Sequence, residues 1–131
     1  MIRELSTRLY NKLSGNGTLV GLTTGIYLGK APQNQDYAYI TFWPVSETSR
    51  HMHDSIIEDT LWQVDVWDSS ITSMTSIQEE IKTSLDGQVL ALSTLTQVGL
   101  VRALTSPLIP DHEEQGGTIW HQAIEYNILV Q

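Results

Sequence analysis

Residues 118–130 read TIWHQAIEYNILV, and this stretch decides the fold of the chain. Successive side chains of a strand point to opposite faces of a sheet, so regular alternation of apolar and polar residues predicts a strand with one buried face. The pattern therefore predicts a long strand whose even-numbered side chains pack against the core. These side chains are Trp120, Gln122, Ile124, Tyr126, Ile128 and Val130.

A second strand signal covers residues 56–68, which read IIEDTLWQVDVWD. Trp62, Val64 and Val66 share one face, which we expect to lie in the core. The opposite face carries Trp67 among polar side chains and is only half apolar. This second face needs cover that a small number of helices does not supply.

An aromatic and β-branched segment, residues 37–45, predicts the partner strand of a hairpin, with Ile40 and Phe42 in the core. Pro44 cannot donate a hydrogen bond to a neighbouring strand, so we expect it at an edge or a bulge. The ten residues between the two strands, 46–55, are polar. We expect them to form the tip of a long β-hairpin arm that reaches a neighbouring subunit.

Two segments have apolar side chains at spacings of three and four, which indicates amphipathic helices. The first begins near Ile2 and ends at residues 15–17, Gly-Asn-Gly, because glycine commonly follows the last helical turn. The second follows N-cap candidates at residues 68–70 and ends at Asp86-Gly87. The apolar stripes are Ile2, Leu5, Leu9 and Leu13 in the first helix, and Ile71, Met74, Ile77, Ile81 and Leu85 in the second.

The remaining segments give weaker signals. Residues 26–28 predict a short strand with a loop on both sides, and residues 98–104 predict another strand. Residues 89–95 are apolar and ambiguous between turn, short helix and strand. Prolines, a charged cluster and a Gly-Gly pair predict that residues 105–117 form a loop.

Two helices are too few to cover both faces of a sheet. We therefore expect an α+β fold, in which a mostly antiparallel sheet of four to five strands has two helices packed on one face and a long β-hairpin arm. The length of 131 residues suits a single domain, 1–131. The candidate core is Leu5, Leu9, Ile40, Phe42, Trp62, Val64, Val66, Met74, Ile77, Ile81, Ile124, Tyr126 and Ile128.

The charge of the chain argues against a nucleic-acid-binding module. Fifteen acidic and seven basic residues give a net charge of −8, whereas nucleic-acid affinity depends mainly on basic residues. Residues 2–13 carry Arg3, Arg8 and Lys12 against Glu4, which gives +2 and leaves −10 on the rest. Such polarity can steer like subunits head to tail, although a solvated helix face is the plainer interpretation.

The N-terminal residues carry charges and lack the apolar run of a signal peptide, and no stretch is long enough to cross a bilayer. The chain has no cysteine, so it has neither a disulfide framework nor a thiolate metal site. We expect a protein that is made in a cytoplasm and has no membrane partner.

His51 and His53 lie next to Asp54 and resemble the start of a metal site. Zinc requires three or four ligands in a fixed geometry, and His112 and His121 would have to converge from distant segments. A polar hairpin tip that exposes its histidines to water is the plainer interpretation. A small metal-dependent enzyme that uses His51 and His53 is the alternative from a different class of protein.

Several segments occur in a characteristic order after the N-terminal helix. They are Ile26-Tyr27-Leu28, Ala31-Pro32, Tyr37-Ala38-Tyr39-Ile40-Thr41-Phe42, Trp62-Gln63-Val64-Asp65-Val66-Trp67-Asp68, Leu85-Asp86-Gly87 and Trp120-His121-Gln122-Ala123-Ile124-Glu125-Tyr126. This pattern resembles the tail-completion family of siphophages, which includes tail-to-head joining proteins and tail terminators similar to that of phage lambda.

The resemblance implies a virion protein without catalytic residues, metal or cofactor. It implies a homohexameric ring on the tail tube, which ends tail polymerisation and contacts the tail-tube protein and the head connector protein. The negative charge of the chain, rather than the resemblance, suggests that genome DNA passes through the ring without specific binding. A head-side connector or head-closure ring of similar size is the alternative within the same class, and a monomeric adaptor is another. The residues expected to contact other subunits or partners are Arg50, His51, Met52, His53, Trp67, Asp111, His112, Glu113 and Glu114.

Overall fold

The computed structural model describes residues 1–114 and 116–131 and has the predicted α+β fold. In the order of the chain, its elements are α1 (Ile2–Ser14), α2 (Gly17–Leu22), β1 (Gly25–Leu28), β2 (Tyr39–His51), β3 (Ile56–Asp68), α3 (Ile71–Leu85), β4 (Gln97–Thr105), β5 (Ile109–Glu114) and β6 (Gly117–Val130). The strands form one sheet in the order β1-β2-β3-β6-β4, and β5 pairs with the first residues of β6. Only the pairing of β1 with β2 is parallel among the described strands.

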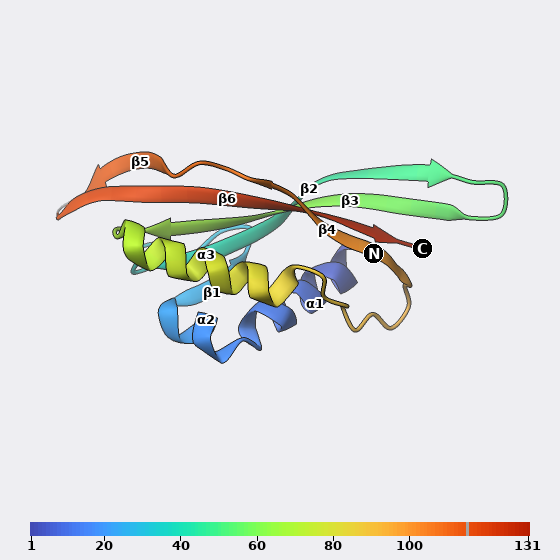
Figure 1. Ribbon diagram of the computed structural model, residues 1–131, viewed down its shortest axis with the longest axis horizontal. Coiled ribbons are helices and arrows are strands. Elements are labelled where there is room, and N and C mark those ends of the chain that lie inside the picture. Colours follow the sequence, from blue (N-terminus) through green and yellow to red (C-terminus); the bar gives the residue numbers. More distant parts are fainter. Residues whose placement is uncertain (115) are drawn as a thin grey trace.

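The helices lie together on one face of the sheet, as expected, and leave the other face without helical cover (Figure 1). The core fills the space between the helices and the sheet. The residues chosen from the sequence as candidate core each have a relative exposure of 0% or 1% in the structure. Trp62, Tyr126 and Phe42 are the largest of the fully buried side chains.

The pairing of β3 with β6 places the two alternating sequences in matching register. Trp62 lies opposite Tyr126, and Val64 lies opposite Ile124. Directly opposed residues of antiparallel strands point to the same face, so both strands turn their apolar side chains toward the helices. The same register puts the odd-numbered residues of β3 and β6 together on the uncovered face.

The structure contains a helix that the sequence analysis does not predict. Helix α2 begins right after Asn16, whose side chain accepts a hydrogen bond from the backbone of Leu19 at 3.1 Å. The side-chain amide of Asn16 also donates to the Ser84 hydroxyl of α3 at 2.9 Å. Residues 15–17 therefore separate two helices instead of leading into a loop. Six residues with one buried side chain, Leu19, are too few for a periodic signal.

The hairpin is more regular than predicted. Strand β2 continues to His51 and β3 begins at Ile56, so only residues 52–55 form the turn and the predicted ten-residue tip is wrong. Polar residues dominate residues 46–55 because both faces of the outer hairpin meet water. The bulge expected at Pro44 is confirmed, since the register shifts between Pro44 and Ser46.

The predicted loop at residues 105–117 is also wrong, because it contains β5. All six residues of β5 are exposed, so no buried face imposes an apolar pattern. A bulge between Pro110 and His112 accommodates the proline. Gln115 lies outside the described residues, and residues 89–95 belong to neither a helix nor a strand. No helix among the described residues is long and apolar enough to cross a membrane.

Candidate functional site

A row of stacked rings lies on the uncovered face of the sheet. The rings of Tyr37 and Tyr39 are 5.5 Å apart, those of Tyr39 and Trp67 are 6.4 Å apart, and those of Trp67 and His121 are 4.1 Å apart. Trp67 is the register partner of both Tyr39 and His121, so three adjacent strands align their rings. The side chain of Trp67 is thus half-buried by neighbours from its own sheet.

Asp65 holds His121, the last ring of this row, in place. It is 4% exposed although it lies on the uncovered face. Its carboxylate accepts hydrogen bonds from Trp43 Nε1 at 2.9 Å and Gln63 Nε2 at 2.8 Å, and it lies 2.7 Å from His121 Nε2. Burial opposes ionisation of Asp65, but the hydrogen bonds from His121, Gln63 and Trp43 outweigh it and keep the pKa of Asp65 below its ordinary value.

We expect His121→Phe to lower the free energy of unfolding by about 1–3 kcal/mol at about pH 5, because the buried carboxylate of Asp65 loses a hydrogen-bond partner. Phenylalanine keeps the stacking on Trp67, so the hydrogen bond is the main loss. A depressed pKa in the folded state stabilises the protein above the unfolded pKa of about 3.9, and this contribution disappears as the pH falls through the folded pKa.

The difference between wild type and His121→Phe should therefore shrink as the pH falls below the unfolded pKa of about 3.9, as judged by urea unfolding at a series of pH values. Asp65→Asn is the matched control, since it removes the negative charge of the carboxylate and retains the shape of the side chain. A difference for His121→Phe that does not change with pH would contradict this account.

A second group of titratable side chains surrounds Glu114 at the end of β5. The Tyr37 hydroxyl donates to Glu114 Oε1 at 2.9 Å, and His112 bridges Glu114 at 2.9 Å and Asp111 at 2.6 Å. Hydrogen bonds from His112 and Tyr37 lower the pKa of Glu114. Hydrogen bonds to the carboxylates of Glu114 and Asp111 raise the pKa of His112. Partial burial and the nearby Glu114 raise the pKa of Tyr37 to about 12. Glu114 is consequently ionised at neutral pH.

The two groups meet in an open groove of about 600 Å³. We call it the aromatic groove, and it is lined by Tyr37, Tyr39, Trp67 and Glu114 together with the loop of residues 29–36. The groove places Tyr37, at the end of the row of rings, near the carboxylate of Glu114, which is a combination suited to a cationic side chain.

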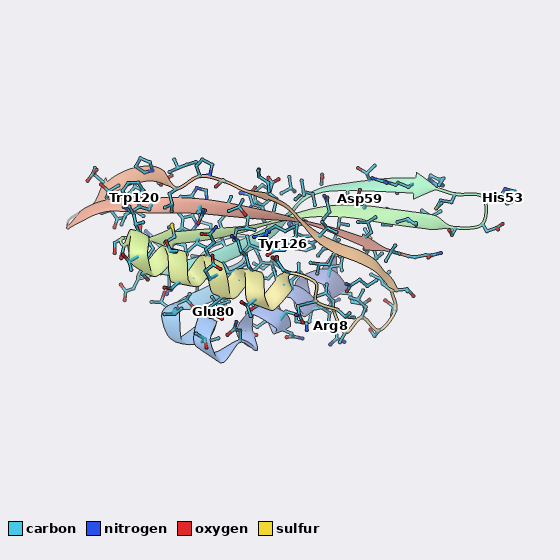
Figure 2. All side chains as sticks on the ribbon, in the orientation of Figure 1. Arg8, His53, Asp59, Glu80, Trp120 and Tyr126 are labelled. Atoms are coloured by element: carbon cyan, nitrogen blue, oxygen red, sulfur yellow. The ribbon has the colours of Figure 1, made fainter. Side chains whose placement is uncertain are left out.

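The residues expected to contact partners lie in two separate groups. Trp67 and residues 111–114 lie at the end of the sheet that carries Trp120, whereas Arg50 and residues 51–53 lie at the tip of the hairpin at the opposite end (Figure 2). Trp67 and Glu114 line the aromatic groove. Asp111 and His112 adjoin it through Glu114, and Glu113 accepts a hydrogen bond from Thr118 at 2.7 Å.

The outer hairpin extends beyond the body of the molecule (Figure 1). We call residues 46–59 the arm. All of its residues are exposed or half-buried, and the side chain of His53 at its tip is 99% exposed. Arg50 pairs with Asp59 across the two strands at 2.9 Å. The two strands of the arm pair with each other, Glu58 and Asp59 also pair with β6, and no arm side chain is among the buried core residues.

The histidines of the arm do not form a metal centre in the structure. His51 ends β2 and His53 lies in the turn, where its nearest carboxylate is Asp54 at 3.8 Å. Within residues 1–114 and 116–131, no three histidine, aspartate or glutamate side chains are grouped to hold a metal ion.

Tyr37, Tyr39 and Asp65 were not identified as site residues from the sequence. Asp65 and His121 stand out in the sequence only as polar residues on the half-apolar face. Their contact depends on the register between β3 and β6, and the contact between Tyr37 and Glu114 spans 77 positions of the chain. No local pattern encodes either contact.

A family model matches most of the chain. The family model described as "Tail completion protein gp17" matches residues 7–130. No curated protein sequence matches the chain.

Two solved structures share the fold. A chain from the "Virion of native gene transfer agent (GTA) particle" superimposes with a TM-score of 0.81 at 15% sequence identity, and the match covers 97% of this chain and 94% of that chain. The "Structure of bacteriophage SPP1 gp17 protein" gives a TM-score of 0.64 at 16% identity, and the match covers 98% of this chain and 90% of that one. At these identities the likeness establishes the fold alone.

Proposed function

Because the chain belongs to the tail completion protein gp17 family, and is therefore a structural protein of phage tails, we propose that it caps the tail tube as a ring. In this role it ends tail polymerisation and provides the surface to which the head is joined. Its partners are other copies of itself, in a homohexamer, together with the tail-tube protein and the head connector protein. Genome DNA passes through the ring without specific binding, as the net charge of −8 on each subunit favours.

The arm is the observation that carries this proposal. An isolated two-stranded hairpin is at best marginally stable in water, and among the described strands the outer strand of the arm pairs only with its partner in the hairpin. Contact with a neighbouring subunit in the ring would cover it. The arm lies at one end of the molecule, and β5 and the end of β3, which contribute Glu114 and Trp67 to the aromatic groove, lie at the other (Figure 1). Different surfaces at opposite ends favour head-to-tail contacts, which close into a ring when the rotation fits.

The groups described above favour binding over catalysis. Both carboxylate oxygens of Asp65 are engaged by neighbouring side chains, Glu114 is engaged at Oε1 by Tyr37 and His112, and the histidines near them are held in these contacts. General acid-base catalysis needs a group free to exchange a proton with a substrate. We therefore infer a non-enzymatic protein that acts in the virion, at the interface between tail and head.

Electron microscopy of particles made without this gene tests the proposal. We expect tails of excessive length, or tails and heads that lie unjoined, and the wild-type gene supplied in trans should restore normal particles. Tails of normal length beside heads that have lost their DNA would favour the alternative, a head-side connector or head-closure ring. Normal, joined and infectious particles would contradict both.

A further inference from the structure

We propose that the aromatic groove of each subunit binds the basic face of helix α1 of the next subunit in the ring. The basic face consists of Arg3 and Arg8, which line one depression on the surface of α1. This inference rests on the proposed ring and specifies which two surfaces of the chain form its repeating contact.

The aromatic groove has the chemistry of a receptor for cations. The negative face of an aromatic ring attracts a guanidinium within about 6 Å of the ring centre, and Tyr37, at the end of the row, has a stacked neighbour on one side only. Arginine also stacks on such rings and forms two parallel hydrogen bonds with a carboxylate. Glu114 and Asp36 supply carboxylates at the groove, and Lys30 is the one basic residue among its lining residues.

The basic face supplies cations that are available for such a contact. Arg3 is exposed and Arg8 is half-buried, and both line one shallow depression on the surface of α1. No ion pair formed within the described part of the chain includes Arg3, Arg8 or Lys12. Glu4 lies in the same depression, but its carboxylate is held by hydrogen bonds from Thr94 and Ser93, which lower its pKa to about 2.

The two surfaces lie apart within one subunit. Helix α1 begins at the chain end marked N, on the side of the body toward the arm, whereas β5 and the end of β3 lie at the opposite end (Figure 1). Figure 2 shows Arg8 below the sheet, well removed from Trp120 at the groove end. A contact between these surfaces therefore joins two copies, and its repetition gives a head-to-tail ring.

Charge selects α1 over the arm as the occupant of the groove. The arm carries Glu47, Asp54, Glu58 and Asp59 against Arg50 alone, so it is acidic like the groove. Like charges that face each other across an interface disfavour that pairing. Helix α1, in contrast, carries a net +2 over residues 2–13, and two of its three cations, Arg3 and Arg8, lie in one depression. The arm is then left to contact a different surface of its neighbour.

A charge swap provides the test, with the variants supplied in trans to particles that lack the gene. Arg8→Glu and Glu114→Arg should each lower the titre of functional particles by about a hundredfold, because like charges then meet in every contact of the ring. The double variant Arg8→Glu/Glu114→Arg should recover to within about tenfold of wild type, since opposite charges face each other again. Lys82→Glu and Glu79→Arg make the same charge changes on α3 and should have little effect.

Far-UV circular dichroism and thermal unfolding of each purified variant verify that it folds. The absence of cysteine from the chain allows a second measurement. A Thr7→Cys/Asp36→Cys variant, treated with a short bis-maleimide, should form a ladder of linked copies, and Met52→Cys/Asp36→Cys should not. A ladder from the arm pair alone would overturn the proposal.

The remaining outcomes separate this contact from the proposed function. If particles without the gene have abnormal tails but both single variants restore them fully, the contact is wrong and the proposed function stands. A folded double variant that is as defective as the single variants would also overturn the contact. If loss of the gene leaves particles normal, the proposed function itself is wrong.

Discussion

Replacement of Trp62 by alanine is expected to lower the free energy of unfolding by about 3–5 kcal/mol. Trp62 is 1% exposed and is the largest fully buried side chain. Its ring packs 6.4 Å from that of Phe42, and its Nε1 donates to the Thr60 hydroxyl at 3.1 Å. Alanine would leave a cavity between the helices and the sheet and remove this hydrogen bond. Domains of this size have a total stability of about 5–15 kcal/mol, so the loss is a large fraction of it.

Urea unfolding followed by circular dichroism measures this loss as a lower midpoint at unchanged slope. Trp62→Phe is the matched control, because it retains most of the buried ring and loses the hydrogen bond to Thr60; we expect a cost of about 1–2 kcal/mol. Val89→Ala, at a side chain with 71% exposure, should change stability by less than about 0.5 kcal/mol. If Trp62→Ala also changed the free energy of unfolding by less than about 0.5 kcal/mol, the packing between helices and sheet would not depend on this ring.

Shortening the arm should have the largest effect on assembly and almost none on folding. Ser49 and Glu58 are register partners, so residues 50–57 can be replaced by Asn-Gly, which favours the tight turn of a two-residue hairpin. The free energy of unfolding should stay within about 1 kcal/mol of wild type, since the deleted residues contribute nothing to the core. The titre of functional particles should fall to that of particles without the gene, because the shortened arm no longer reaches its neighbour.

A variant that keeps the length of the arm and replaces only residues 52–55 with glycine and serine is the control for this deletion. It separates the reach of the arm from the chemistry of its tip. Full complementation by the shortened arm, with normal tail length, would show that the arm has no part in assembly. A failure of both variants would assign the contact to the tip residues.

Much of the fold could be predicted from the sequence because a shared buried face imposes a regular pattern. Residues 118–130 and 56–68 alternate, since both strands turn one side toward the same helices. Helix α3 shows a clear stripe for the same reason. Helix α2 has one buried residue, Leu19, and β5 has none, so neither element leaves a pattern.

The candidate site was harder to predict, because strand register creates it. Trp67 was expected at a subunit contact from its place on a half-apolar face, and that role stays a prediction. Its stacking on His121 and its position beside Glu114 depend on strands distant in the chain. Register is set by the packing of the whole sheet, so polar residues on the uncovered face show their partners only in three dimensions.

The positions of the indole rings have a practical consequence for experiments. Trp62 lies in the core, whereas Trp67 lies in the aromatic groove beside the ring of His121. A chain in which Trp43, Trp62 and Trp120 are changed to phenylalanine would keep Trp67 as its one tryptophan, so its tryptophan fluorescence would come from the groove alone. Its emission would shift to shorter wavelength when another molecule covers Trp67 and excludes water, so the protein carries an optical sensor of its own association without any attached dye.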